Sequence, residues 1–134
     1  MKTIIIWVGA FWFAILNHLS KNHPETSFFE YEKDAFVLQH LKETRESPYF
    51  FSGVKLRENI TFLDTLEQLC EFDLIIIAIP AQFVGNFVAS IQGSLQTWVT
   101  FLNLSKGINN QTLQTPGDIL AENLWNFPYH YAIL

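Results

Sequence analysis

A single glycine, Gly9, stands near the amino terminus where one apolar segment gives way to another. Residues 2–17 read KTIIIWVGAFWFAILN, a pattern typical of a buried strand, a tight turn at Gly9 and the first turn of a helix. Backbone amides at such a helix start can hold phosphate groups. If the turn at Gly9 is open, we therefore expect the amides of Gly9, Ala10, Phe11 and residue 12 to face a pyrophosphate.

The turn departs from the dinucleotide-binding fingerprint G-x-G-x-x-G. Aligned on Gly9, the fingerprint requires glycine at positions 7, 9 and 12, but positions 7 and 12 are Trp7 and Trp12. Their bulk is the opposite of what a backbone approaching a pyrophosphate needs. The motif alone is a failed match, so the interpretation depends on the rest of the chain.

Other side chains that could bind a ligand follow two strongly apolar segments. Residues 72–80 (FDLIIIAIP) predict a central strand closed by Pro80, with Phe83 just beyond it. Residues 99–104 (VTFLNL) predict another buried strand, which Lys106 follows. Doubly wound sheets bind ligands at the carboxyl ends of their strands, so these side chains are expected at the ligand edge.

The sequence indicates no metal site. His18, His23, His40 and His130 show no metal-ligand spacing with Asp or Cys residues, and they receive no catalytic role. Cys70 is the only cysteine, which excludes an internal disulfide. It stands in an apolar-periodic segment, so we expect a buried thiol in a reducing compartment.

The elements that must position these residues alternate along the chain. Strands are predicted at residues 3–7, 27–31, 60–63, 72–80, 99–104 and 129–134, and helices at residues 11–19, 34–44, 64–71, 82–91 and 116–124. In the helix at 64–71, Asp64 and Glu67 are spaced as in a capping box. The alternation implies right-handed crossovers and an α/β fold with a mainly parallel, doubly wound sheet.

Length and charge narrow the class of protein. A chain of 134 residues suffices for one domain. A net charge of −5, with scattered Lys and Arg, argues against a nucleic-acid surface. Residues 4–16 carry no charge, but a membrane span takes about 20 residues and no signal cleavage site follows. A small exported or membrane-associated protein remains the less favoured alternative.

Several segments together resemble the amino-terminal domain of the NAD(P)-dependent glycerol-3-phosphate dehydrogenase family. They are VGAFWFAILNHL, YEKD, SGVKLRENITFLDTLEQ, FDLIIIAIPAQFV and FLNLSKGINNQTLQTPGDILAENL, of which AIPAQFV and NLSKGI are the most specific. The resemblance covers nearly the whole chain. It implies a Rossmann-type dinucleotide-binding domain over residues 1–134, with helices on both faces of the sheet.

The resemblance also implies an activity. Family members use NAD or NADP to interconvert dihydroxyacetone phosphate and sn-glycerol 3-phosphate by hydride transfer, in the cytoplasm and in support of phospholipid synthesis. The full-length enzyme is a possible homodimer. The family's helical substrate domain has no counterpart in this sequence, so we expect this chain alone to be inactive. The main alternative is a non-catalytic nucleotide-binding or regulatory domain with a degenerate fingerprint.

Roles for single residues follow from the same resemblance. Trp7, Gly9, Ala10, Phe11 and Trp12 fall on the family's cofactor-binding turn. The resemblance places further cofactor-binding residues after two later strands. Pro80 and Phe83 follow the first of these, with Phe83 expected near the nicotinamide, and Lys106 follows the second. The family counterpart of Lys106 contacts both cofactor and substrate, where an ammonium can stabilise charge on the reacting oxygen. Lys106 is the catalytic candidate.

Tyr31 and Lys33 match an aromatic-x-basic pair that the family places near the adenine ribose. Lys33 could pair with a 2′-phosphate, whereas Glu30 or Glu32, 21 and 23 residues beyond Gly9, could accept a hydrogen bond from a 2′-hydroxyl. Lys33 would thus favour NADP, whereas Glu30 or Glu32 would favour NAD. The sequence leaves the preference between NAD and NADP open.

The tryptophans stand where glycine would be plausible. Trp7 and Trp12 fall on fingerprint glycines, Trp98 on a turn entering a strand, and Trp125 after a helix, where glycine is the usual left-handed cap. Six glycines in 134 residues are about 4.5%, and ten would be about 7.5%, close to the ordinary share of roughly 7%. We hypothesise UGA codons that the organism reads as glycine. Deliberate engineering and natural loss of cofactor binding are the alternatives.

Overall fold

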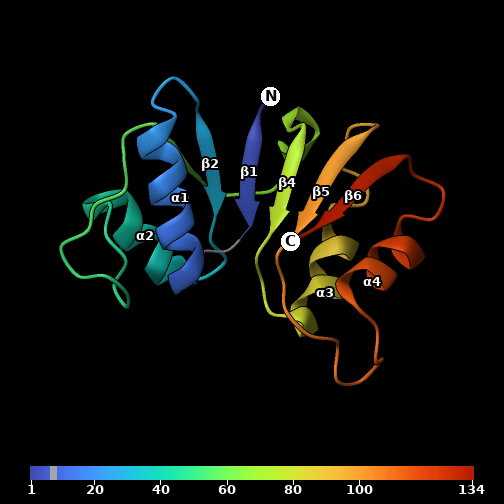
Figure 1. Cartoon of the computed structure of the whole chain (residues 1–134). Coiled ribbons are helices and arrows are strands. Elements are labelled where there is room, and N and C mark those ends of the chain that lie inside the picture. The colour runs from blue at the N-terminus through green and yellow to red at the C-terminus, as the bar shows by residue number, and fades with distance from the viewer. Residues whose placement is uncertain (7–8) are drawn as a thin grey trace.

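One parallel sheet forms the centre of the molecule. The structure is a computed structural model that describes residues 1–6 and 9–134. The described residues form six strands in the order β3-β2-β1-β4-β5-β6, and every neighbouring pair is parallel. The strands are β1 (Thr3–Ile6), β2 (Phe28–Tyr31), β3 (Ile60–Leu63), β4 (Leu74–Ile77), β5 (Val99–Asn103) and β6 (Tyr129–Ile133) (Figure 1).

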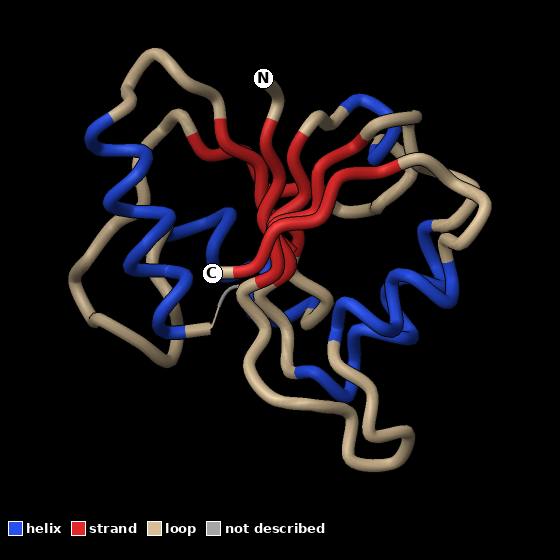
Figure 2. The backbone as a smooth tube through the Cα atoms, turned by 45° about the vertical axis from the view of Figure 1, so that its right-hand side comes forward, coloured by secondary structure: helices blue, strands red, loops and turns tan. Residues whose placement is uncertain are grey.

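Helices cover both faces of this sheet. The helices α1 (Ala10–Asn22) and α2 (Ala35–Thr44) lie on one face, and α3 (Ala81–Ile91) and α4 (Pro116–Asn123) lie on the other (Figures 1 and 2). Each face has its own apolar cluster: Phe13 and Leu16 of α1 pack on the first, and Val84 and Val88 of α3 on the second. The arrangement confirms the predicted doubly wound α/β fold.

Charge-free strand sequences explain why the sheet centre is buried. In β1 and β4 every residue except Leu74 at the start of β4 is buried, as expected for parallel strands that are covered on both faces. β1 and β4 are each four residues long, so the apolar segment 72–80 is longer than β4, the strand that it forms. Phe72 ends a short helical turn, and Pro80 already caps α3.

The predicted helix at residues 64–71 is wrong. Only a single 3₁₀ turn, η1 (Leu69–Glu71), forms there, and neither Asp64 nor Glu67 caps a helix. The carboxylate of Asp64 instead pairs with the Lys42 ammonium of α2. A capping box does occur at α4, where Thr115 and Asp118 bond reciprocally, so the motif exists in the chain but at a different helix.

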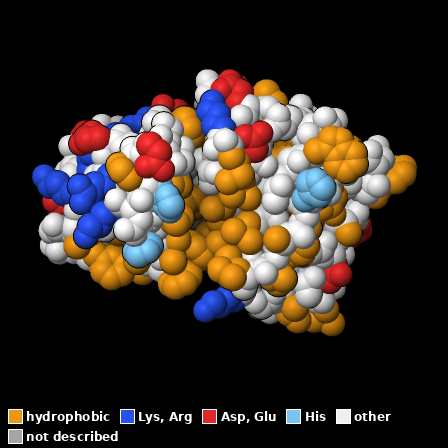
Figure 3. All heavy atoms as spheres, turned by 45° about the horizontal axis from the view of Figure 1, so that its top comes forward, with side chains coloured by type: hydrophobic (Ala, Val, Ile, Leu, Met, Phe, Trp, Pro, Cys, Tyr) orange, Lys and Arg blue, Asp and Glu red, His pale blue; other side chains and the backbone are white. Residues whose placement is uncertain are grey.

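Part of the sheet face on the side of α1 carries no helix in the described part of the chain. α1 and α2 lie over the β1–β3 half, whereas Thr100 and Leu102 of β5 are partly exposed and His130 and Ala132 of β6 are exposed. Hydrophobic side chains gather in the middle of the face that Figure 3 shows, beside the layer of α1 and α2. β6 is therefore the least covered strand.

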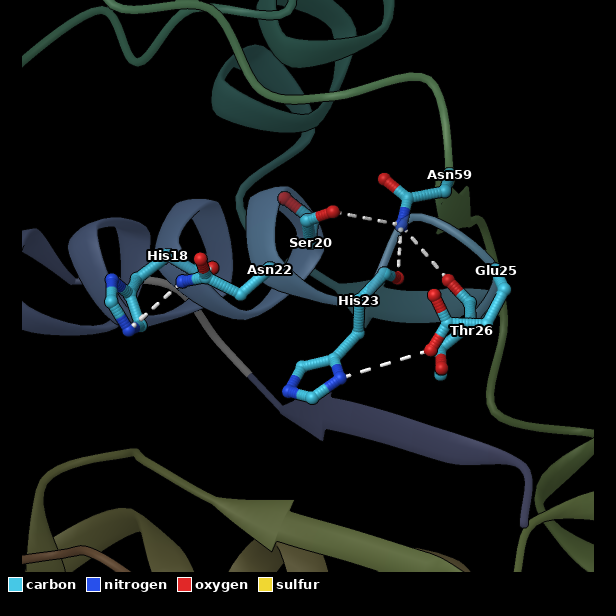
Figure 4. A network of polar contacts seen from close by, with 7 residues as sticks. All are labelled: His18, Ser20, Asn22, His23, Glu25, Thr26 and Asn59. Atoms are coloured by element: carbon cyan, nitrogen blue, oxygen red, sulfur yellow. Dashed lines mark hydrogen bonds and ion pairs between the residues drawn. The ribbon is translucent and has the colours of Figure 1, made fainter.

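Two polar side chains hold the long segment between α2 and β3. Arg45, with φ 62, donates from Nε to the Leu56 carbonyl (3.1 Å) and from Nη2 to the Ile60 carbonyl (2.8 Å). The Asn59 amide donates to the carbonyls of Ser20, His23 and Thr26 at the end of α1 (Figure 4). The loop is thereby tied to both helices of this face.

Two further sequence predictions can be compared with the structure. Cys70 is exposed, so the prediction of a buried thiol is wrong: its neighbour Leu69 occupies the core position instead. Among the described residues, no helix combines the length and the apolar character that a membrane crossing requires.

Candidate dinucleotide site

The amino terminus of α1 opens toward the carboxyl edge of the sheet. Gly9 is the N-cap of α1, with φ −76 and ψ 178, and its carbonyl accepts from the amides of Trp12 and Phe13, both at 3.0 Å. The helix therefore uses the amide of residue 12, contrary to the prediction that it faces a ligand. The amides of Ala10 and Phe11, in the first turn, have no intrahelical acceptor.

Gly9 leaves space in front of this turn. A Cβ atom built at Gly9 would meet no described atom within 4 Å. Because the φ angle is one that any residue adopts, the glycine is valuable for close approach of a ligand rather than for backbone freedom. The space in front of Gly9 is therefore open toward the amides of Ala10 and Phe11.

The indole of Trp12 packs into the interior of the molecule. Trp12 is 7% exposed and belongs to the apolar cluster between α1, α2 and the sheet, with its ring edge-on to Phe11 at 4.7 Å. In the fingerprint the third glycine permits close packing of helix on strand. Position 12 thus bears on the spacing of α1 from the sheet. Trp7, the other fingerprint position, lies outside the described residues.

A polar turn fixes Lys106 just beyond β5. The Asn103 side chain is fully buried; its Oδ1 accepts from the Ser105 amide (3.0 Å), and the Leu104 amide donates to the Ile77 carbonyl of β4 (2.9 Å). Gly107 has φ +86, a left-handed conformation that favours glycine. The sequence NLSKG folds into this turn and leaves Lys106 exposed.

Lys106 and the start of α1 border one hollow of about 690 Å³, named here the turn hollow. The Lys106 Nζ lies 5.8 Å from the centre of the Phe11 ring, within the range of a cation–π contact. Phe11 itself is 59% exposed. Six of the predicted site residues line this hollow: Gly9, Ala10, Phe11, Trp12, Pro80 and Lys106.

Of the remaining predicted residues, the three that the structure describes line a second hollow of about 520 Å³ beside α3, named here the α3 hollow. Tyr31 and Lys33 come from the end of β2, and Phe83 from the first turn of α3. Ile79 lines both hollows. The structure thus divides the predicted site into two neighbouring groups at the carboxyl edge of the sheet.

Two buried acids accompany these groups. Glu30 is fully buried in β2, between Ile5 and Phe62 in register, and neither carboxyl oxygen has a hydrogen-bond partner among the described residues. Burial, and secondarily the charge of Glu32, raises the pKa of Glu30 from 4.5 to about 8. Glu32 is 2% exposed and lines the turn hollow. In the sequence, these two acids were candidates only because they follow Gly9 by 21 and 23 residues.

The backbone distinguishes the two remaining tryptophans. Trp98 has φ 67, which side-chain-bearing residues rarely adopt, and is 64% exposed. Trp125 is 81% exposed but does not share this left-handed backbone, and the C-cap of α4 is Leu124 at φ −117. The expected glycine-type cap is therefore wrong for Trp125, whereas Trp98 does occupy a glycine-type position.

A parallel doubly wound sheet whose first helix starts at an open glycine turn on the ligand edge defines a Rossmann-type domain. The family model described as "NAD-dependent glycerol-3-phosphate dehydrogenase N-terminus" matches residues 2–134. The chain belongs to that family.

Relatives in this family are longer than the chain. The glycosomal NAD⁺ glycerol-3-phosphate dehydrogenase of Leishmania mexicana is 32% identical over 129 residues, which are 92% of this chain and 35% of the relative. An NAD(P)⁺ glycerol-3-phosphate dehydrogenase of Myxococcus xanthus is 27% identical over 125 residues, 92% of this chain and 37% of the relative. The chain spans about a third of the length of these curated relatives.

Solved structures agree on the fold. Glycerol-3-phosphate dehydrogenase from Coxiella burnetii superposes with a TM-score of 0.86 at 11% identity, covering 98% of this chain and 39% of that chain. The enzyme from Plasmodium falciparum gives a TM-score of 0.80 at 21% identity, covering 98% of this chain and 40% of that chain.

Proposed function

We propose that this chain is the NAD(P)-binding part of a glycerol-3-phosphate dehydrogenase. The observation that carries the proposal is the meeting of the α1 amino terminus, Pro80 and Lys106 around one hollow at the carboxyl edge of the sheet. The reaction would interconvert dihydroxyacetone phosphate and sn-glycerol 3-phosphate, with the bound nicotinamide cofactor supplying or accepting the hydride.

Each group of residues has a defined task in this proposal. The amides of Ala10 and Phe11 hold the pyrophosphate at the positive end of α1, and Gly9 allows it to approach. Phe83 and Tyr31 offer apolar surface for the rings of the cofactor. The Lys106 ammonium borders the turn hollow. There it would stabilise the negative charge that develops on a substrate oxygen.

The proposal includes the hypothesis that the tryptophans are glycines in the organism. Support comes from Trp98, whose left-handed φ of 67 suits glycine, and from the fingerprint positions of Trp7 and Trp12. Trp125 adds none. Codons in the source gene decide the matter, because UGA at these positions supports the hypothesis and UGG contradicts it.

Titration with NADH tests the proposed function. We expect a Trp7→Gly, Trp12→Gly chain to bind NADH, followed by nicotinamide fluorescence, and the chain as written to bind at least about 10-fold more weakly. A matched Trp125→Gly chain controls for the loss of an indole and should bind like the chain as written. Failure of the double glycine variant to bind NADH or NADPH, with its fold intact by circular dichroism, contradicts the proposal.

The cellular setting is also a proposal. We place the full enzyme in the cytoplasm, with phospholipid synthesis as the consumer of its product and a homodimer as its possible assembly. Relatives named glycosomal and chloroplastic exist, so fractionation of the source cells is the relevant measurement.

A further inference from the structure

The two edges of the sheet differ in how they are protected. β3 forms one edge and β6 the other. At β3, the Arg45 Nη2 donates to the Ile60 carbonyl (2.8 Å), and the guanidinium lies 5.0 Å from the centre of the Phe62 ring. Asp64, just after the strand, pairs with Lys42. Charged side chains along an edge hinder its pairing with another strand, so β3 is a protected edge.

β6 lacks this kind of protection. It is the outermost strand beside β5, and among the described residues no strand lies beyond it (Figure 1). Residues 123–134 contain no Lys, Arg, Asp or Glu. After Tyr129 every residue of β6 is exposed, and Ile133 is 70% exposed. An uncharged strand with a free edge and residues of high β-propensity is a template for another strand.

The backbone of β6 presents alternate residues to this free edge. The Leu134 amide donates to the Asn103 carbonyl of β5 at 3.2 Å, so the peptide groups of residue 134 face inward. Successive residues of a strand direct their N–H and C=O groups to opposite edges. The even-numbered residues of β6 therefore face β5, and the N–H and C=O groups of Tyr129, Tyr131 and Ile133 point outward.

These outward groups are self-complementary. A second β6 that runs antiparallel to the first can place Tyr131 opposite Tyr131 of the second copy, and Tyr129 opposite Ile133 of that copy. Each outward N–H then faces an outward C=O, as in the hydrogen-bonded pairs of an antiparallel sheet. The opposed side chains are aromatic or β-branched, which favours such pairs, and none carries a charge that would repel its counterpart.

We propose that β6 is an interface through which two copies of this chain pair edge to edge into one continuous sheet. The partner is a second copy because the two-fold register about Tyr131 satisfies every outward group of both strands at once. The proposal does not depend on dinucleotide binding, since it uses only the backbone and side chains of β6.

Sedimentation velocity of the chain as written tests the pairing. We measure it from about 5 to about 500 µM, in about 0.5 M salt to screen the net charge of −5 on each copy, and expect the mass to rise from monomer to dimer. Ile133→Pro removes one outward N–H and no bond to β5, so it should weaken dimerisation at least about 10-fold. A chain that stays monomeric throughout overturns the proposal.

A pair of lysine substitutions separates the edge from general surface effects. Ile133→Lys should weaken dimerisation about 10-fold, whereas Ile108→Lys, at another exposed isoleucine, should change it less than about 2-fold. Circular dichroism checks the fold of each variant. Dimerisation that is equally strong in the chain as written and in both Ile133 variants overturns the proposal.

Cross-linking tests the register. In a Cys70→Ser chain with oxidised glutathione, Tyr131→Cys should form a disulfide-linked dimer, because the Cα atoms of such a pair lie about 5.5 Å apart. Ile133→Cys is the matched control: in this register its two thiols lie far from each other, so it should cross-link at least about 10-fold more slowly. Equal rates at the two positions, or no cross-link through Tyr131→Cys, overturn the two-fold pairing.

Discussion

The Nζ atom of Lys106 lies 5.8 Å from the centre of the Phe11 ring, which brings the loop after β5 beside the first turn of α1. These residues are far apart in sequence, and the parallel order β1-β4-β5 brings their loops to one edge. The exposed ring and the ammonium together form one wall of the turn hollow.

Removing the Lys106 charge should weaken dinucleotide binding. In the double glycine chain, Lys106→Met keeps the length of the side chain, and we expect the NADH dissociation constant to rise about 10-fold at low salt. Lys55→Met, in an exposed part of the loop before β3, is the matched control and should change it less than about 2-fold. Equal effects of the two substitutions would count against a role for Lys106 at the site.

Position 98 should prefer glycine to alanine, and position 125 should not. Because Trp98 has φ 67, Trp98→Gly should be more stable than Trp98→Ala by about 1 kcal/mol in urea unfolding. At Trp125 the backbone is not left-handed. The Trp125→Ala variant should therefore be as stable as Trp125→Gly, or more stable by up to about 0.5 kcal/mol. The same order of stability at both positions would contradict the backbone assignment.

Burial of Glu30 should make folding stability fall as pH rises. Its carboxyl stays protonated in the folded chain up to a pKa of about 8 but ionises near 4.5 when unfolded. The folded state therefore binds the extra proton between these values, so stability is full below about pH 4.5 and declines toward pH 8, by an upper limit of roughly 5 kcal/mol.

Glu30→Gln should flatten this pH dependence and raise the free energy of unfolding above pH 8, measured by urea titration at several pH values. Glu67→Gln, at an exposed position, serves as the control and should retain the slope. A slope that persists in Glu30→Gln would show that other groups cause it.

The Asn59 side chain should contribute more to stability than an exposed helix asparagine. Its amide donates to the carbonyls of Ser20 (3.2 Å), His23 (3.2 Å) and Thr26 (2.9 Å) (Figure 4). Asn59→Ala should lower the free energy of unfolding by about 1 to 3 kcal/mol, because it removes a donor from three carbonyls, of which that of His23 keeps, among the described residues, only the Thr26 amide (3.0 Å).

Asn22→Ala is the matched control for Asn59→Ala. Among the described residues, the Asn22 side chain bonds to His18 alone, within the same exposed helix turn, so its loss should cost less than about 0.5 kcal/mol. Thermal unfolding of both variants gives the comparison, and equal shifts in melting temperature would contradict it.

Strong periodicity made most of the fold predictable from the sequence. The run LIII in β4 and the spacing of Val84, Phe87 and Val88 in α3 have one consistent interpretation each. The helix at 64–71 failed because Asp64 and Glu67 satisfied a local capping rule, while Leu66 and Leu69 could be buried by a short turn without a full helix.

The candidate site was predictable only in its parts. Chain order indicated that Gly9, Pro80 and Lys106 would meet at the carboxyl edge, because parallel strands end there together. It could not show that Lys33 and Glu32 border different hollows, because both residues follow the end of β2, where the regular alternation of strand side chains no longer applies. It also gave no sign that Trp12 would be buried in the core.

The left-handed backbone at Trp98 has a consequence outside this molecule. A source that reads UGA as glycine would mark all of its proteins in the same way when its genes are translated with a table that gives tryptophan. Its translated sequences would then show tryptophan at tight turns and phosphate-binding loops, at positions whose backbone conformation favours glycine. The backbone conformation at each written tryptophan could thus show whether its codon is read as glycine.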